Sequence, residues 1–187
     1  MLTRSFSTDA TVEGRTLTGI AAYWDRASNV TDNGRDFYLE AFSNTAADKT
    51  LKERGSKPFP LGFLHPWSSS AGTDKRPLGS VTFSRSNEGL VFNAVLSRTQ
   101  AADEMLELVK DGAVTDVSIG FNSYKHKVQD KVLIRTEIGL RELSLAPTGL
   151  GQHQGAEVLA VRSLEATKSR LETERRLAEL RLWSPYK

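Results

Sequence analysis

Strands dominate the middle of the chain, and this limits the possible fold more than any other feature of the sequence. Residues 79–85 and 90–96 alternate apolar with polar side chains, and Asn87-Glu88-Gly89 separates them, which is typical of a β-hairpin. Three further strands are predicted at residues 114–123, 131–138 and 140–146. Because these strands are not separated by regular helices, the pattern favours a mainly β or α+β core and excludes a repeated βαβ fold.

Shorter signals surround this region. Residues 15–24 predict a strand, residues 37–42 predict a strand or a helix start, and the proline-containing residues 58–64 predict an irregular or edge strand. Residues 45–54 predict a helix. A second helix is predicted from the capping residue Thr99 to about Lys110, with an apolar face made of Ala101, Met105, Leu108 and Val109.

Composition narrows the chemistry of the 187-residue chain, whose length suits one domain that buries its own core. The absence of cysteine excludes disulfides, thiolate zinc sites and a cysteine nucleophile. The three histidines, His65, His126 and His153, form no short metal-ligand spacing, and no glycine-rich phosphate-binding motif occurs. We therefore expect neither a metal nor a cofactor.

Charge and hydropathy argue against two classes of partner. Lysine plus arginine total 25 and aspartate plus glutamate total 23, and the net charge of +2 is too small to predict nucleic-acid binding. Lys125, Lys127 and Lys131 cluster with Tyr124 alone, which indicates a solvated strand face. No apolar run approaches the roughly 20 residues of a membrane helix, so no membrane association is expected.

The C-terminal residues differ in composition from the rest. Residues 163–182 are rich in leucine, glutamate and arginine and contain no glycine or proline, which predicts a helix. Two interpretations remain open. The helix either packs on the domain or faces solvent as an ordinary amphipathic helix, or it forms a separable tail that docks elsewhere or is removed.

A serine, a histidine and a glutamate each lie on, or at the end of, a predicted strand. Ser118 lies on the polar face of its strand beside the side-chain-free Gly120, because side chains alternate between faces. His65 follows an apolar run, and Glu142 lies opposite its apolar neighbours in residues 140–146.

These residue types suit nucleophilic catalysis. Serine is a weak nucleophile until a base accepts its proton, and a third group must orient the imidazole and stabilise its charged form. Because any β domain carries serines and glutamates at solvent-facing positions, His65, Ser118 and Glu142 alone do not distinguish a catalytic triad from surface residues.

The order and spacing of several sequence motifs are more specific for a protein family than these three residues alone. Val117-Ser118-Ile119-Gly120-Phe121 is similar to the motif S-I-G-F, and residues 140–147 are similar to L-x-E-V-S-L-V-x-x-P. Upstream come residues 19–23, residues 37–42, the apolar stretch ending in His65, residues 77–80 and residues 88–92. In this order, over about residues 15–161, the chain resembles the prohead, or capsid maturation, serine proteases of tailed bacteriophages.

This resemblance implies a fold similar to that of the herpesvirus assemblin proteases, a β-barrel with flanking helices, followed here by the C-terminal helix. It divides the chain into a serine protease domain at residues 1–161 and a charged helical tail at residues 162–187, either self-cleaved or used for docking. It assigns the base to His65 and the nucleophile to Ser118. Glu142 is the expected third member, and His153 is the alternative, because a second histidine has this role in the herpesvirus relatives.

The implied activity is that of a serine endopeptidase. Members of the family act inside the phage procapsid, in the host bacterial cytoplasm, where they cleave scaffold segments from the major capsid protein and usually cleave themselves. The expected partners are the major capsid protein and its scaffold segment, and self-association is left open. The alternative is a non-enzymatic capsid assembly or scaffolding protein with a protease-like fold.

Overall fold

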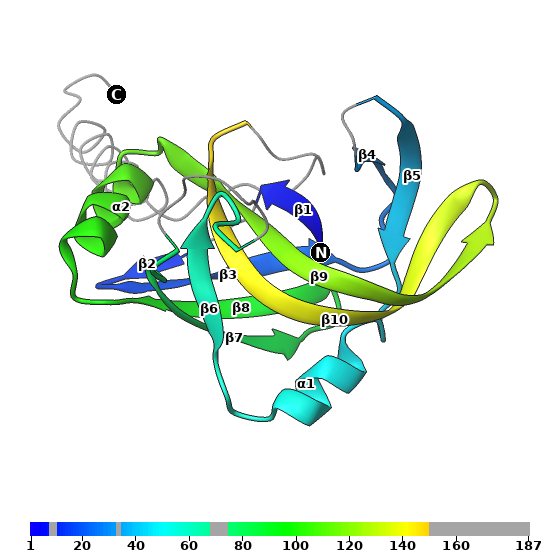
Figure 1. Cartoon of the computed structure of the whole chain (residues 1–187), viewed down its shortest axis with the longest axis horizontal. Helices are drawn as coiled ribbons and strands as arrows, with labels where there is room; N and C mark the ends of the chain where they lie inside the picture. Colours follow the sequence, from blue (N-terminus) through cyan, green and yellow to red (C-terminus); the bar gives the residue numbers. More distant parts are fainter. Residues whose placement is uncertain (8–10, 33–34, 68–74, 150–187) are drawn as a thin grey trace, which may run out of the picture.

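The alternating segments join into one curled, ten-stranded sheet in the computed structural model, which describes residues 1–7, 11–32, 35–67 and 75–149 (Figure 1). The strands are β1 (Leu2–Ser7), β2 (Thr11–Glu13), β3 (Thr16–Tyr23), β4 (Ser28–Thr31), β5 (Phe37–Phe42), β6 (Phe59–Phe63), β7 (Gly79–Arg85), β8 (Gly89–Leu96), β9 (Val114–Gln129) and β10 (Val132–Pro147). The helices are α1 (Asp48–Arg54) and α2 (Gln100–Lys110). Hydrogen bonds connect the strands in the order β1-β9-β10-β6-β7-β8-β3-β2, with β5 beside β10 and β4 beside β5.

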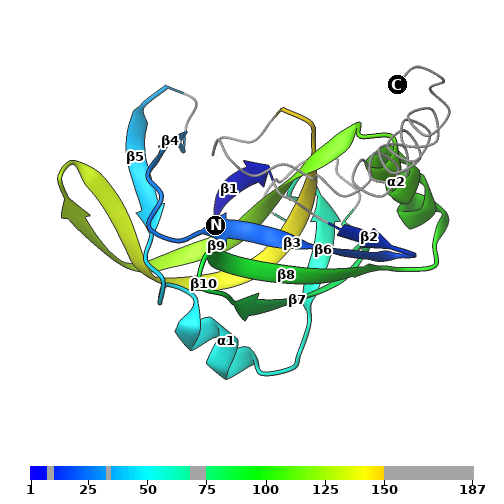
Figure 2. The same ribbon diagram turned by 180° about the vertical axis from the view of Figure 1, so that it is seen from behind.

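The sheet curls around an apolar core. Phe42, Phe92 and Phe121 are almost fully buried there, and Phe42 meets Phe121 edge-on with ring centroids 5.4 Å apart. The helix α1 contacts β10 and β7, and α2 lies at the other end of the curl against β9 and β8 (Figures 1 and 2). The prediction of a mainly β fold is confirmed, and the sheet forms a curled half-barrel where the resemblance implies a β-barrel with flanking helices.

The strands β9 and β10 form one long hairpin where the sequence predicts three separate strands. Asp130 and Lys131 make its turn with positive φ values of 51° and 65°. The antiparallel register then shifts around Glu137 and between Leu140 and Glu142. These bulges interrupt the alternation of side chains inside a continuous strand, which is why the pattern predicts a strand end there.

The strand β6 lies inside the sheet, so of the two predictions for residues 58–64, an irregular or an edge strand, the edge strand is wrong. It pairs in parallel with β10 and antiparallel with β7. Pro60 pairs with Ser80 of β7, whereas the parallel pairing with β10 begins only at Leu61. The missing proline N–H therefore removes no hydrogen bond from the ladder with β10.

The helix α2 begins as predicted, because the Thr99 side chain accepts a hydrogen bond from the backbone N–H of Ala102. Its buried residues are Ala102, Met105, Leu106 and Val109. The predicted face was thus half correct, since Ala101 is exposed and Leu108 is 41% exposed. Both residues line a pocket considered below.

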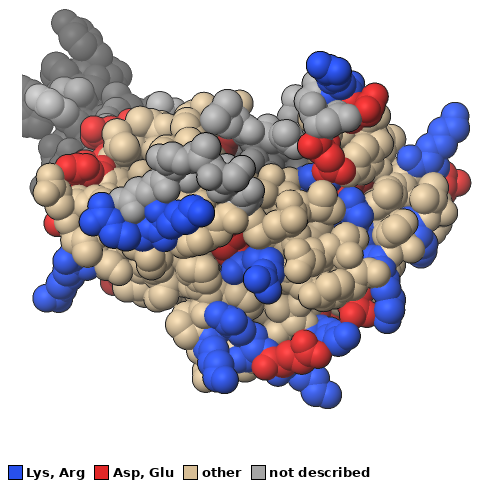
Figure 3. Space-filling view, viewed as in Figure 1, with Lys and Arg blue, Asp and Glu red and all other residues tan. Residues whose placement is uncertain are grey.

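Charged side chains of both signs are interspersed on the face seen in Figure 3. Lys125 is exposed and pairs with Glu137 at 2.6 Å, which agrees with the predicted solvated strand face. In the part of the chain that the structure describes, no helix is long and apolar enough to cross a membrane. The predicted C-terminal helix and the proposed tail, residues 162–187, lie outside the described residues.

Candidate active site

Neighbouring strands place four small or polar residues on one face of the sheet. Ser118 of β9 lies directly opposite Ser144 of β10, and Gly120 lies directly opposite Glu142. Residues two apart on a strand project from the same face. Ser118 and Gly120 therefore share a face with Glu142 and Ser144, and these positions are adjacent across the two strands.

His65 reaches this face from the end of β6, which runs parallel to β10 with Phe63 beside Leu145. Leu64 and His65 then adopt positive φ values of 53° and 54°, which residues other than glycine rarely adopt. Two hydrogen bonds of 3.1 Å hold this turn against β10. Leu64 N–H donates to the carbonyl of Leu145, and His65 N–H donates to Ser144 Oγ.

The imidazole of His65 connects Glu142 to Ser118. Its Nδ1 lies 2.5 Å from Glu142 Oε1, and its Nε2 lies 2.5 Å from Ser118 Oγ. A carboxylate can only accept, so the proton of the first hydrogen bond belongs to Nδ1, which leaves Nε2 as the acceptor for the serine hydroxyl. The basic nitrogen of the ring therefore faces the serine.

Ser144 supports both the histidine and the glutamate. Its Oγ accepts from the backbone of His65 and lies 3.4 Å from Glu142 Oε2, to which it donates. Ser118, Glu142 and Ser144 are at most 1% exposed, whereas the His65 side chain is 13% exposed. Burial strengthens these hydrogen bonds by lowering the local dielectric. Of these four residues, His65 is therefore the most accessible to solvent.

Gly120 provides the space that Glu142 occupies. A Cβ atom at position 120 would lie 2.6 Å from Glu142 Cγ and 2.8 Å from Oε1. Gly62 of β6 has the same function under the loop that carries His65, because a Cβ there would lie 2.7 Å from Pro66 Cδ and 2.8 Å from the ring of Trp67. Both glycines are therefore needed for close approach and not for backbone flexibility.

The structure brings together three of the four residues singled out from the sequence. Ser118 and Glu142 each lie within hydrogen-bond distance of the His65 ring, and the action of the three residues as a catalytic triad stays a prediction. His153, the alternative third member, lies outside the described residues. Ser144 was missed, although its position two residues after Glu142 places it on the same face. Among the described residues, no group of three or more His, Cys, Asp or Glu side chains is arranged to hold a metal ion.

Comparison with known proteins decides the family. The model of the caudovirus prohead serine protease family matches residues 4–170. The chain belongs to this family. The match confirms the resemblance based on motifs, and it includes every residue of the candidate site described above. No curated protein sequence matches this prohead protease family member significantly.

The fold of this prohead protease family member is similar to a solved structure. The structure of the bacteriophage T4 capsid assembly protease, gp21, superimposes with a TM-score of 0.53. The two chains are 10% identical, and the similarity covers 78% of this chain and 99% of the other. At so low an identity the likeness concerns the fold alone.

Proposed function

We propose that this chain is a serine endopeptidase of capsid maturation, with His65, Ser118 and Glu142 as its catalytic triad. The observation that supports it most strongly is the line of hydrogen bonds from Glu142 through His65 to Ser118. Membership in a family of serine proteases makes peptide-bond hydrolysis the reaction that fits this line.

Hydrolysis proceeds through an acyl-enzyme. Ser118 Oγ attacks the scissile carbonyl carbon while His65 Nε2 takes the hydroxyl proton, and His65 then passes this proton to the leaving amine. A water molecule next gives a proton to the same nitrogen as its oxygen attacks the ester, and the second product leaves with Ser118 Oγ reprotonated. Glu142 stabilises the imidazolium that forms in each half of the reaction.

Ser144 and Gly120 act through these residues. Ser144 fixes the backbone of His65 and the second oxygen of Glu142, so it restricts the movement of both groups. Gly120 allows the glutamate side chain to lie across β9 toward the imidazole. We assign positioning roles to both, because neither would touch the reacting bond.

The substrate we propose is the scaffold segment of the major capsid protein, cleaved inside the procapsid in the host bacterial cytoplasm. The family is that of prohead proteases, and the structurally similar T4 protein is a capsid assembly protease. We further propose that the protease cleaves its own chain, with residues 162–187 as the removed tail.

Co-expression with the major capsid protein tests the triad. Ser118→Ala is expected to slow removal of the scaffold segment by roughly 10⁴-fold or more. Gel electrophoresis and intact-mass measurement of the capsid protein would measure this removal. Ser84→Ala, at an exposed strand serine on β7, is the matched control and should process the capsid protein normally. A fluorophosphonate probe should label Ser118 in the wild-type protein.

Normal processing by Ser118→Ala would refute the triad. Particles that assemble equally well with wild-type and Ser118→Ala protein, with the capsid protein uncut in both, would instead indicate the non-enzymatic assembly role.

A further inference from the structure

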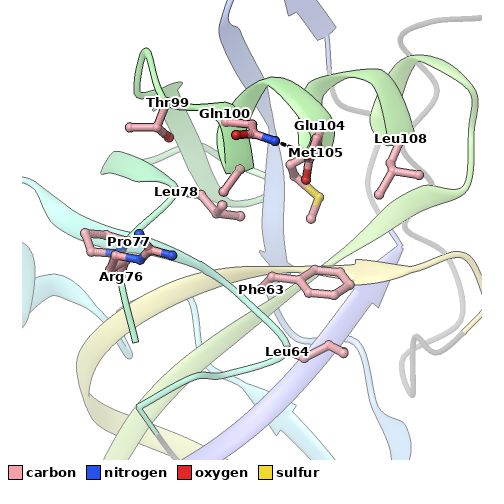
Figure 4. A pocket seen from close by; sticks show the side chains of 11 residues that line it. Phe63, Leu64, Arg76, Pro77, Leu78, Thr99, Gln100, Glu104, Met105 and Leu108 are labelled. Atoms are coloured by element: carbon pink, nitrogen blue, oxygen red, sulfur yellow. Dashed lines mark hydrogen bonds between the residues drawn. The ribbon is translucent and has the colours of Figure 1, made fainter. Parts of the chain in front are cut away.

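A pocket opens between the helix α2 and the end of β6, where Leu64, the residue before His65, is part of its lining (Figure 4). Its volume is about 690 Å³, within the range of roughly 300–1,000 Å³ that is usual for ligand sites. Its apolar wall consists of Phe63, Leu64, Pro77, Leu78, Ala101, Met105 and Leu108. Figure 4 shows Phe63 and Leu64 on one side and Met105 and Leu108 of α2 on the other.

We propose that this pocket binds one large apolar side chain of the polypeptide substrate, within about three residues of the bond that Ser118 cleaves. The proposal rests on the proposed function, because it needs a polypeptide bound at Ser118. It adds the chemical class of residue that the protease selects.

The position of the pocket supports this occupant. Leu64 directly precedes His65, whose Nε2 lies 2.5 Å from the nucleophilic oxygen. Consecutive Cα atoms are about 3.8 Å apart, and an extended peptide advances about 3.3 Å per residue. Because the imidazole and its hydrogen bond add to the Cα–Cα step, the pocket wall begins at most about three residue lengths from the reacting bond, within reach of a bound polypeptide.

The exposure of the wall indicates an apolar ligand. Leu64 is 46% exposed and Leu108 is 41% exposed, although both are large apolar residues. The positive φ of Leu64 holds it beside the pocket in a conformation that leucine rarely adopts. A substrate side chain that covers these residues removes apolar surface from water and gains roughly 10- to 100-fold in binding.

The polar residues of the lining, Arg76 included, already have partners within the protein. The Thr99 hydroxyl accepts from the N–H of Ala102 at the start of α2, and the Gln100 amide donates to Glu104 at 3.0 Å. These groups are therefore not left unsatisfied when an apolar side chain enters. The pocket favours leucine, isoleucine, methionine or phenylalanine over polar residues.

Ala101→Trp is the variant that fills the pocket. Ala101 lines the pocket but is exposed on α2, so the larger side chain does not disturb the core. Glu107→Trp is the matched control, because Glu107 is exposed on the same helix and does not line the pocket. Thermal unfolding of both variants checks that they fold as the wild-type protein does.

The first measurement is cleavage of a peptide library prepared from a bacterial proteome, with cut sites identified by mass spectrometry. The wild-type protein should cut next to sites enriched in large apolar residues at one position within three residues of the bond. Ala101→Trp should lower kcat/KM for these peptides roughly 10- to 100-fold, mainly through KM, and shift the preference toward glycine, alanine and serine. Glu107→Trp should keep the wild-type preference.

The second measurement is independent of catalysis. Immobilised Ser118→Ala protein should retain peptides enriched in the same large apolar residues, and adding Ala101→Trp should abolish this enrichment. Absence of apolar enrichment, or an unchanged preference after Ala101→Trp, would overturn the pocket assignment. If instead the proposed function is wrong, the wild-type protein neither cleaves peptides nor reacts with a fluorophosphonate. Peptide capture would still show whether the pocket binds apolar side chains.

Discussion

At the scale of single residues, the candidate site depends on Gly120, because this residue has no side chain. Glu142 reaches His65 by lying across Gly120, where a Cβ atom would come within 2.6 Å of Glu142 Cγ. Alanine at this position has to displace the glutamate, because its neighbours on β9 and β10 are fixed by the sheet. The backbone itself tolerates alanine, since the φ of Gly120 is not positive. The effect should thus fall on catalysis more than on folding.

Gly120→Ala is expected to lower kcat by roughly 10²- to 10⁴-fold, comparable to loss of the orienting carboxylate in other serine proteases. The rate of peptide cleavage and the thermal midpoint would be measured together. The control is a double-mutant cycle with Glu142→Ala. If Gly120 acts only through Glu142, the double variant should be no slower than Glu142→Ala alone. A further large loss in the double variant would contradict this role.

The sequence predicts the three residues of the proposed triad, but it does not predict Ser144, which supports them. Motifs and alternation single out His65, Ser118 and Glu142, and the structure places these side chains in contact. The function of Ser144 needs the register between β9 and β10 and the turn after β6, which join residues far apart in the chain. No local pattern encodes such long-range pairing.

At the scale of elements, a buried ionic cluster ties the N-terminal strand to the sheet. Arg4 of β1 and Arg135 of β10 both contact the carboxylate of Glu40 on β5, at 2.5 and 2.6 Å. Arg4 also donates to the Tyr38 hydroxyl, which in turn donates to Asp32. Because β1 pairs with β9 along the segment that contains Ser118, this cluster also fixes the strand that lies beside the candidate nucleophile.

The cluster predicts a loss of stability at alkaline pH. Burial and the hydrogen bond to Asp32 raise the pKa of Tyr38 to about 12, whereas an unfolded tyrosine titrates near 10. Between these values the folded state retains a proton that the unfolded state has lost, so the free energy of unfolding falls as pH rises. This contribution is fully present below about pH 10 and is lost through about pH 12.

Urea unfolding of wild-type and Tyr38→Phe protein at pH 8, 10 and 11 would measure this contribution. The stability difference between the two proteins should shrink or reverse as pH rises, because phenylalanine has no proton to lose. A difference that stays constant over this range would exclude Tyr38 as the source.

The strands β6 and β10 also show why the sequence does not predict every part of the fold. The prolines of residues 58–64 suggest an irregular or edge strand, yet β6 lies between β7 and β10, and its parallel pairing with β10 begins only after Pro60. The bulges of β10 likewise resemble strand ends in sequence. Local alternation of apolar and polar residues predicts where strands occur. The order of the strands depends on pairing between segments far apart in the chain, which local alternation does not encode.

At the scale of the whole molecule, the family match can be compared with the division into a protease domain and a tail that the resemblance implies. The match extends to residue 170, beyond the boundary at residue 161 that the motifs suggest. Residues 162–187 lie outside the described residues, and their composition predicts a charged helix. Because such a tail would belong to the same chain, a tail long enough to reach Ser118 would have an effective concentration there on the order of millimolar, which would favour self-cleavage.

Intact-mass measurement of purified protein tests the proposed removal of this tail. The wild-type protein should lose a C-terminal fragment cut near residue 161, whereas Ser118→Ala should keep its full mass. Ser84→Ala should be shortened as the wild-type protein is, which shows that a serine-to-alanine change elsewhere on the sheet does not itself prevent the cut. A rate that does not depend on protein concentration would indicate cleavage within one chain, and a rate that rises with concentration would indicate cleavage between chains. Equal masses for wild-type and Ser118→Ala protein, apart from the substitution, would refute self-cleavage and leave the tail as a docking element.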